Sequence, residues 1–152
     1  MNTLLKPETG TFILRVSLGV VLIAHSLYLK MVVFTLPGTA QFFSSIGLPA
    51  ISAYLVFAVE VAAGIALILG YRTRIFSSMV IPVLLGATWV HWSNGWLFTN
   101  NGGGWEYPLF LVAAALAQVG LGDGKFSISA YRSTASRSDN STYISSYNKK
   151  AA

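Results

Sequence analysis

The sequence predicts an all-α protein, an integral membrane four-helix bundle with a short external interfacial helix. Hydrophobic residues make up 54% of the chain and charged residues 10%, and the mean hydropathy is +0.61. A soluble domain usually carries about 25% charged residues. Four apolar stretches are long enough to cross a bilayer, and Lys and Arg gather on one side of them.

We expect the four spans over residues 11–29, 50–70, 75–92 and 108–121. Residues 31–49 are too irregular for a further span. Within them Thr39 can cap a short helix over 40–46, which Gly47 and Pro49 end. Its apolar side chains favour a position in the interface. Pro82 is expected to kink the third span.

The basic residues predict the orientation of the bundle. One group of eight falls on the side of the termini and the second loop: Lys6, Arg72, Arg74, Lys125, Arg132, Arg137, Lys149 and Lys150. Lys30 alone falls on the other side. Both termini should therefore be cytoplasmic. We divide the chain into a transmembrane domain, 1–124, and a Ser-rich, basic and largely disordered cytoplasmic tail, 125–152.

Composition also excludes several classes of function. The chain has no cysteine, so it forms no disulfide and holds no thiol relay or iron–sulfur cluster of its own. The net charge of +5 is explained by membrane topology and does not indicate nucleic-acid binding.

Glu60 is the one charged residue in the apolar stretch 53–70 and should lie near the bilayer midplane. Ala53, Ala63 and Gly64 share its helical face and allow a neighbouring helix to approach closely. An intramembrane carboxylate is costly unless it is protonated, paired or hydrated. It could handle a proton, a cation or a polar ligand, or it could fix the helix register through an ion pair or hydrogen bond.

Arg15 lies about one turn inside the first span. Its side chain could snorkel to the nearby headgroups. It could instead turn inward toward Glu60, because Gly19 and Ser26 fall close to the same face.

Further polar residues come near the external ends of the spans: His25, Lys30, His91 and Glu106. Together they could line one cavity suited to proton transfer or to a quinone headgroup. These residues form only a weak pattern for metal ligation. No other feature of the sequence supports axial haem ligation by His25 and His91. Alternatively, the histidines form interfacial hydrogen bonds and Glu106 stabilises a helix N-terminus. Trp105 belongs to an aromatic belt or to a ligand box.

The candidate catalytic residues are therefore Glu60, His91 and Glu106, for proton or ligand handling. The candidate cofactor-binding residues are His25, Arg15, Lys30 and Trp105. No metal site is expected.

A series of short motifs follows in order along the chain: Arg15-x-x-x-Gly19, His25, Lys30, Ile46-Gly47-Leu48-Pro49, Val59-Glu60, Leu69-Gly70-x-Arg72-x-Arg74, His91 with Asn94-Gly95, Trp105-Glu106-Tyr107-Pro108 and Gly122-x-Gly124. In this order, over about residues 12–130, the chain resembles the DoxX family of four-span bacterial membrane proteins. The resemblance implies the bacterial cytoplasmic (inner) membrane and, for some members, a role as a membrane subunit of a quinone-linked oxidoreductase such as thiosulfate:quinone oxidoreductase.

We therefore expect a membrane subunit or accessory protein of a quinone-linked redox complex, with quinone as the expected cofactor. The sequence leaves open whether it is itself catalytic or a non-catalytic subunit of an oxidoreductase complex. The expected partners are the lipid bilayer, an oxidoreductase subunit and, left open by the sequence, a second copy of the chain. The alternatives are a small proton-coupled transporter and a structural or assembly factor without catalysis.

Overall fold

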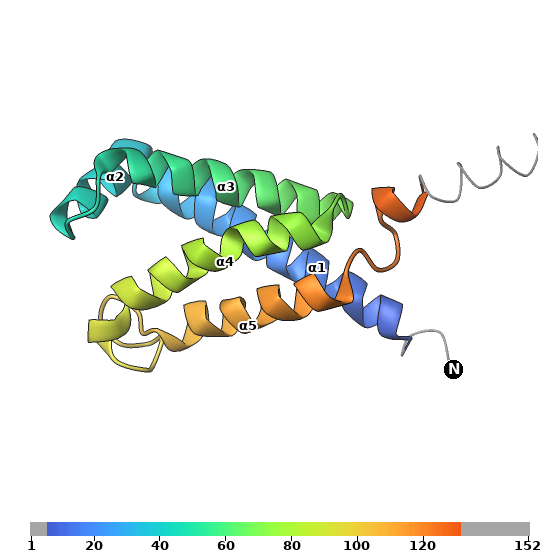
Figure 1. Ribbon diagram of the computed structural model, residues 1–152. Helices are drawn as coiled ribbons and strands as arrows, with labels where there is room; N and C mark the ends of the chain where they lie inside the picture. Colours follow the sequence, from blue (N-terminus) through green and yellow to red (C-terminus); the bar gives the residue numbers. More distant parts are fainter. Residues whose placement is uncertain (1–5, 132–152) are drawn as a thin grey trace, which may run out of the picture.

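The computed structural model describes residues 6–131, and these form a bundle of helices without a strand (Figure 1). The elements are α1 (Pro7–Ile23), η1 (Ala24–Val33), α2 (Leu36–Ser45), α3 (Ala50–Leu69), α4 (Thr73–Val90), η2 (Trp92–Asn94) and α5 (Glu106–Leu121). The predicted all-α fold is confirmed. The expected tail beyond residue 131 lies outside the described residues.

Among the described residues, three helices are long and apolar enough to cross a membrane. They are the continuous helix 7–33 with 27 residues, α3 with 20 and α4 with 18. Helix α5 is apolar but has 16 residues, which corresponds to a length of about 24 Å. The chain is therefore a multi-pass membrane protein.

The start of α1 and the segment after α5 lie at the same end of the bundle, because the amide of Lys125 donates to the carbonyl of Glu8 at 3.4 Å. We call this the terminal end. Helix α2 and the loop 91–105 lie at the opposite end, which we call the loop end (Figure 1). This arrangement agrees with an even number of crossings, and the cytoplasmic orientation of the termini stays a prediction.

Helices α1 and α3 cross where two glycines face each other. A Cβ added to Gly19 would lie 2.9 Å from the carbonyl oxygen of Gly64 and 2.8 Å from a side-chain carbon of Ile68. Ala63, next to Gly64, is fully buried, and so is Ala53 further along α3. The small-residue face predicted around Glu60 is therefore a helix contact, which allows the two backbones to approach closely.

The apolar core forms a layer across the middle of the bundle. Its buried members are Leu18, Leu22, Ala63, Leu67, Val80, Leu84, Leu111, Val112 and Ala115. Along each helix these residues lie between polar groups of the terminal end and polar groups nearer the loop end. The bundle therefore has two polar regions separated by packed apolar side chains.

Two local expectations need correction. The short external helix begins at Leu36, and Thr35 caps it by accepting a hydrogen bond from the Gly38 amide at 3.2 Å. Thr39 instead lies inside the helix. Proline favours the first turn of a helix, and with Pro37 in that turn the helix begins earlier in the chain than expected. The first helix does not end at Lys30 but continues to Val33. Pro82 lies inside α4, and the kink expected there stays a prediction.

Asp123 joins the ends of α4 and α5. Its Oδ1 accepts hydrogen bonds from the Thr73 amide at 3.0 Å and the Thr73 hydroxyl at 2.6 Å. It therefore satisfies a free amide at the start of α4, as a capping residue does. Burial by itself raises the pKa of Asp123, but hydrogen bonds from Thr73 and Ser129 and the charge of Arg15 outweigh it and lower the pKa below its ordinary value.

We expect Asp123 to make the stability of the bundle depend on pH. A carboxyl group whose pKa is lower in the folded state stabilises the fold above its unfolded pKa of about 4 and loses that contribution as the pH falls through the folded value. The Asp123→Asn variant should be less stable at pH 7, by about 1 kcal/mol. Its thermal unfolding in detergent should also change less than that of the wild type between pH 6 and pH 3. Identical pH profiles would contradict this role.

Candidate functional site

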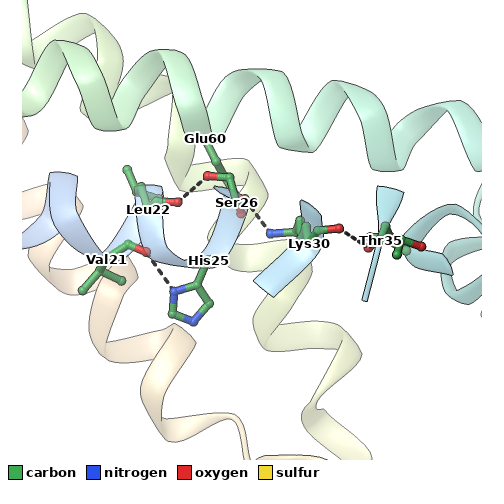
Figure 2. Close-up of polar contacts among 8 residues, drawn as sticks. Val21, Leu22, His25, Ser26, Lys30, Thr35 and Glu60 are labelled. Atoms are coloured by element: carbon green, nitrogen blue, oxygen red, sulfur yellow. Dashed lines mark hydrogen bonds and ion pairs between the residues drawn. The ribbon is translucent and has the colours of Figure 1, made fainter. Parts of the chain in front are cut away.

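Glu60 forms an ion pair with Lys30. The Nζ of Lys30 lies 2.5 Å from Oε2 of Glu60, and the two side chains are 18% and 7% exposed. Side chains on a helix lean toward its N-terminus, and η1 and α3 run in opposite directions. Lys30 therefore leans into the bundle from the loop end while Glu60 leans outward to meet it (Figure 2). The carboxylate predicted to be buried is thus paired.

The neighbours of this ion pair come from η1 and α5. Ser26 is fully buried, and its hydroxyl donates to the carbonyl of Leu22 (Figure 2). His25 directs Nδ1 to the carbonyl of Val21 at 2.9 Å. Its ring is stacked on Tyr107 of α5, with centroids 5.9 Å apart. Because a carbonyl can only accept, Nδ1 carries the proton and Nε2 remains an acceptor in the neutral ring.

Lys30, Ser26 and His25 all belong to the ten-residue π-helix η1. A π-helix has more residues per turn than an α-helix, and such segments occur often at functional sites. The wider turn changes which residues of the first helix face α3. In this way the local backbone places Lys30 opposite Glu60.

The residues His91, Glu106 and Trp105 contribute to a compact loop instead. Nδ1 of His91 lies 2.8 Å from the Ala87 carbonyl. Glu106 accepts a hydrogen bond from the Phe98 amide at 2.8 Å. The Trp105 ring stacks on that of Trp92 at 4.6 Å and meets Trp96 edge-on at 4.4 Å.

The loop is closed by side-chain amides. Asn94 donates to the carbonyls of Gly102 and Gly103 at 3.1 and 2.9 Å, and Asn100 donates to the carbonyl of Asn94 at 2.8 Å. The predicted outer set therefore divides into two parts within residues 6–131. Lys30 and Glu60 are bonded to each other with His25 beside them, whereas His91 and Glu106 bond to their own helix and loop.

Arg15 lies in neither of its two expected positions, at the headgroups or beside Glu60. The side chain is fully buried, so it does not snorkel, and it does not reach Glu60. Its Nη1 donates to the Leu67 carbonyl at 2.9 Å, and its Nη2 donates to the carbonyls of Lys125 and Phe126, both at 3.1 Å. The last carbonyls of a helix have no partner within its regular hydrogen bonds. The Gly70 amide donates to the Leu67 carbonyl at 3.2 Å, and Nη1 of Arg15 adds its own bond there and also reaches the Ile68 carbonyl at 3.4 Å, so Arg15 helps to satisfy the end of α3.

A lateral groove of about 500 Å³ lies between the loop 91–105 and α5. Its walls are apolar and mostly aromatic, and they include Trp96, Phe98, Tyr107, Leu109 and Phe110. Tyr107 belongs to both the groove and the stack with His25. One side chain therefore connects the groove with the surroundings of the ion pair.

Sequence reasoning did not pair Lys30 with Glu60, and it grouped Tyr107 with the tryptophans of the aromatic belt or ligand box without placing it beside His25. The first of these had a usable signal, because Lys30 is the single basic residue on the loop side and Glu60 the single carboxylate within the second span. No group of three or more potential metal ligands occurs among residues 6–131.

A family model for DoxX matches residues 10–92, just over half of the chain. The chain belongs to the DoxX family. The match includes Arg15, His25, Lys30, Glu60 and His91, and it ends before the loop that carries Trp105 and Glu106. The proposed resemblance over residues 12–130 is thus supported over its first two thirds.

Among curated proteins, this DoxX chain is similar to one from Bacillus subtilis (strain 168) named "Putative oxidoreductase CatD". The two are 39% identical over 80 residues, which are 53% of this chain and 58% of the relative. The aligned part therefore covers less than two thirds of that protein. No solved structure matches the chain significantly.

Proposed function

We propose that this DoxX protein is a membrane subunit of a quinone-linked redox complex in the bacterial inner membrane, and that the Lys30–Glu60 pair binds the quinone headgroup. The observation that carries the proposal is this partly exposed ion pair in the loop-end half of an apolar bundle. Intramembrane charged residues are expensive and commonly mark sites of function. The name of the Bacillus relative agrees with redox chemistry.

The donors and acceptors present fit a quinone. An ammonium group has three N–H donors, and Lys30 uses one for Glu60. The others can bind a quinone carbonyl oxygen. Carboxyl and imidazole groups serve as general acids and bases in proteins, so Glu60 and Nε2 of His25 could exchange protons with that oxygen. The quinone, when bound, supplies the chemistry of accepting two electrons and two protons to become a quinol.

The lateral groove supports access from the lipid phase. It is apolar, it runs along α5, and Tyr107 connects it with His25. A headgroup could therefore approach the ion pair while an apolar chain remains in lipid-like surroundings. The chain has no cysteine for an iron–sulfur cluster, so in this proposal a partner subunit delivers the electrons. We place both termini in the cytoplasm, following the distribution of Lys and Arg.

Two other functions receive less support. A proton-coupled transporter needs a polar route through the membrane, whereas the nine buried apolar residues lie between the two polar regions. A purely structural role is favoured by one observation, the direct pairing of Glu60, which a helix-registering ion pair would also show. The quinone-binding role and the purely structural role predict different results for the Glu60→Gln variant.

We expect Glu60→Gln to fold and to lose quinone. Gln keeps the shape of Glu and can still accept a hydrogen bond from Lys30, but it cannot release or accept a proton at neutral pH. Quinone extracted from protein purified in mild detergent should fall about tenfold per mole of protein, equivalent to about 1.4 kcal/mol of binding. Oxidoreductase activity of the intact membrane complex should fall with it.

The control is Lys125→Gln at the terminal end, where the backbone of Lys125, and not its side chain, contacts Arg15. That variant should retain quinone at the wild-type level. Full quinone retention and activity in Glu60→Gln would reject the quinone site and favour the structural role.

A further inference from the structure

Three buried polar atoms near the terminal end of the bundle have no hydrogen-bond partner within residues 6–131. They are Nε of Arg15, Oγ of Ser77 and Oε1 of Gln118. All three side chains are fully buried. An unsatisfied buried polar atom costs about 1–3 kcal/mol, and three of them together would be a large fraction of the stability of a small protein. A partner outside residues 6–131 is therefore expected.

Ser77 and Gln118 lie at the same depth in the bundle. The hydrogen bonds between Thr73 and Asp123 align the start of α4 with the end of α5. Ser77 follows Thr73 by one helical turn, and Gln118 precedes Gly122 by one turn and donates to its carbonyl at 2.5 Å. Because α4 and α5 are antiparallel neighbours, both side chains lie about 5 Å inside that alignment point.

Arg15 reaches the same region from α1. Its guanidinium group is bonded to the carbonyls of Lys125 and Phe126, directly after Asp123. Its charge acts on Asp123, which caps α4. The three unpartnered atoms therefore belong to α1, α4 and α5, and the segment that follows α5 joins these helices at the terminal end.

We propose that Arg15, Ser77 and Gln118 bind one internal water molecule between α1, α4 and α5. Nε of Arg15 can only donate, Oε1 of Gln118 can only accept, and the Ser77 hydroxyl can do either. A water molecule complements this set, because it accepts from Arg15, donates to Gln118 and completes its third bond with Ser77. An anion would face the Gln118 oxygen and a cation would face the Arg15 charge. About three hydrogen bonds are typical of buried water.

This site is separate from the proposed quinone site. The apolar layer lies between the two, so the failure of one proposal leaves the other standing. The water would join the three helices at the terminal end without taking part in redox chemistry.

The first test is the sign of the stability change in Ser77→Ala. If the hydroxyl holds a water molecule, its removal breaks a buried hydrogen bond, and the melting temperature in detergent should fall by about 2–4 °C. If the hydroxyl is unpartnered, Ala should leave the melting temperature unchanged or raise it, and the proposal is overturned. The matched control is Ser78→Ala, which changes the exposed neighbour on the same helix and should have no effect.

A double-mutant cycle then distinguishes a shared water from a bond between Ser77 and its own helix. Gln118→Met keeps the length of the side chain and removes its polar atoms. With a shared water, the double variant should lose clearly less than the sum of the two single losses. Strictly additive losses would overturn the proposal. A high-resolution map of the wild-type protein gives a direct readout: ordered density within about 2.6–3.2 Å of all three atoms supports the site, and density that bonds them to protein groups instead rejects it.

Discussion

Replacing Lys30 with Met should lower the free energy of unfolding by about 3 kcal/mol, because it leaves the carboxylate of Glu60 buried without its partner. Met preserves the unbranched length of Lys, so the loss reports on charge rather than on packing. The ion pair is short and mostly buried. Reversible unfolding in mixed micelles, followed by helical circular dichroism, measures the change.

The Glu60→Leu variant and the double variant complete the test. Leu should restore an apolar surface in the bilayer, and the Lys30→Met/Glu60→Leu protein should recover most of the stability lost by Lys30→Met alone. Lys125→Met removes a positive charge at the other end and serves as the control. If Lys30→Met is as stable as the wild type, the ion pair drawn in Figure 2 does not hold η1 against α3.

Measurements of stability and of quinone retention distinguish a structural role of this ion pair from a role in ligand binding. A double variant that is stable but retains no quinone would show that the charges serve the ligand. A double variant that is stable and active would show that they serve neither folding nor function. The apolar replacement therefore complements Glu60→Gln, which keeps the hydrogen bond and removes the titratable proton.

The sequence predicts the helices well, because apolar runs of about 20 residues have few alternatives in a bilayer. It also predicts Glu60 as the residue to explain, since one carboxylate interrupts an otherwise apolar stretch. The partner of Glu60 could not be derived in the same way. Lys30 reaches it because the first helix continues to Val33 in a π-helical form, and no periodic pattern in residues 24–33 specifies that widening.

The polar residues near the loop end show a second limit of prediction from sequence. Depth along the helices brings His25, Lys30, His91 and Glu106 to similar levels, but depth does not determine which side chains meet. The loop 91–105 closes on itself through Asn94 and its tryptophans, and this local folding engages Glu106. Whether these residues handle a ligand stays a prediction.

Arg15 was hard to place from sequence because its partners are backbone carbonyls. Such groups carry no residue identity, and those at the end of α3 lack partners only once the helix has formed. Gly70 is part of the same arrangement. It ends α3 with φ of 70°, and a Cβ there would overlap Nη1 of Arg15 and the side chain of Ser127. An Arg and a distant Gly therefore form one structural unit.

Replacing Arg15 with Met should destabilise the protein by about 3–4 kcal/mol, since it removes the buried hydrogen bond to the carbonyl of Leu67 and leaves the partly buried carbonyls of Lys125 and Phe126 without their donor. Arg15→Lys should recover only part of the loss, because an ammonium group lacks the planar fork that reaches two sides at once. Unfolding in mixed micelles measures both losses, and Arg74→Met, at an exposed position of the same end, is the control. If Arg15→Lys is fully as stable as the wild type, the bidentate arrangement is not what joins residues 125–127 to α3. If Arg15→Met is also fully stable, the guanidinium group does not hold the terminal end together.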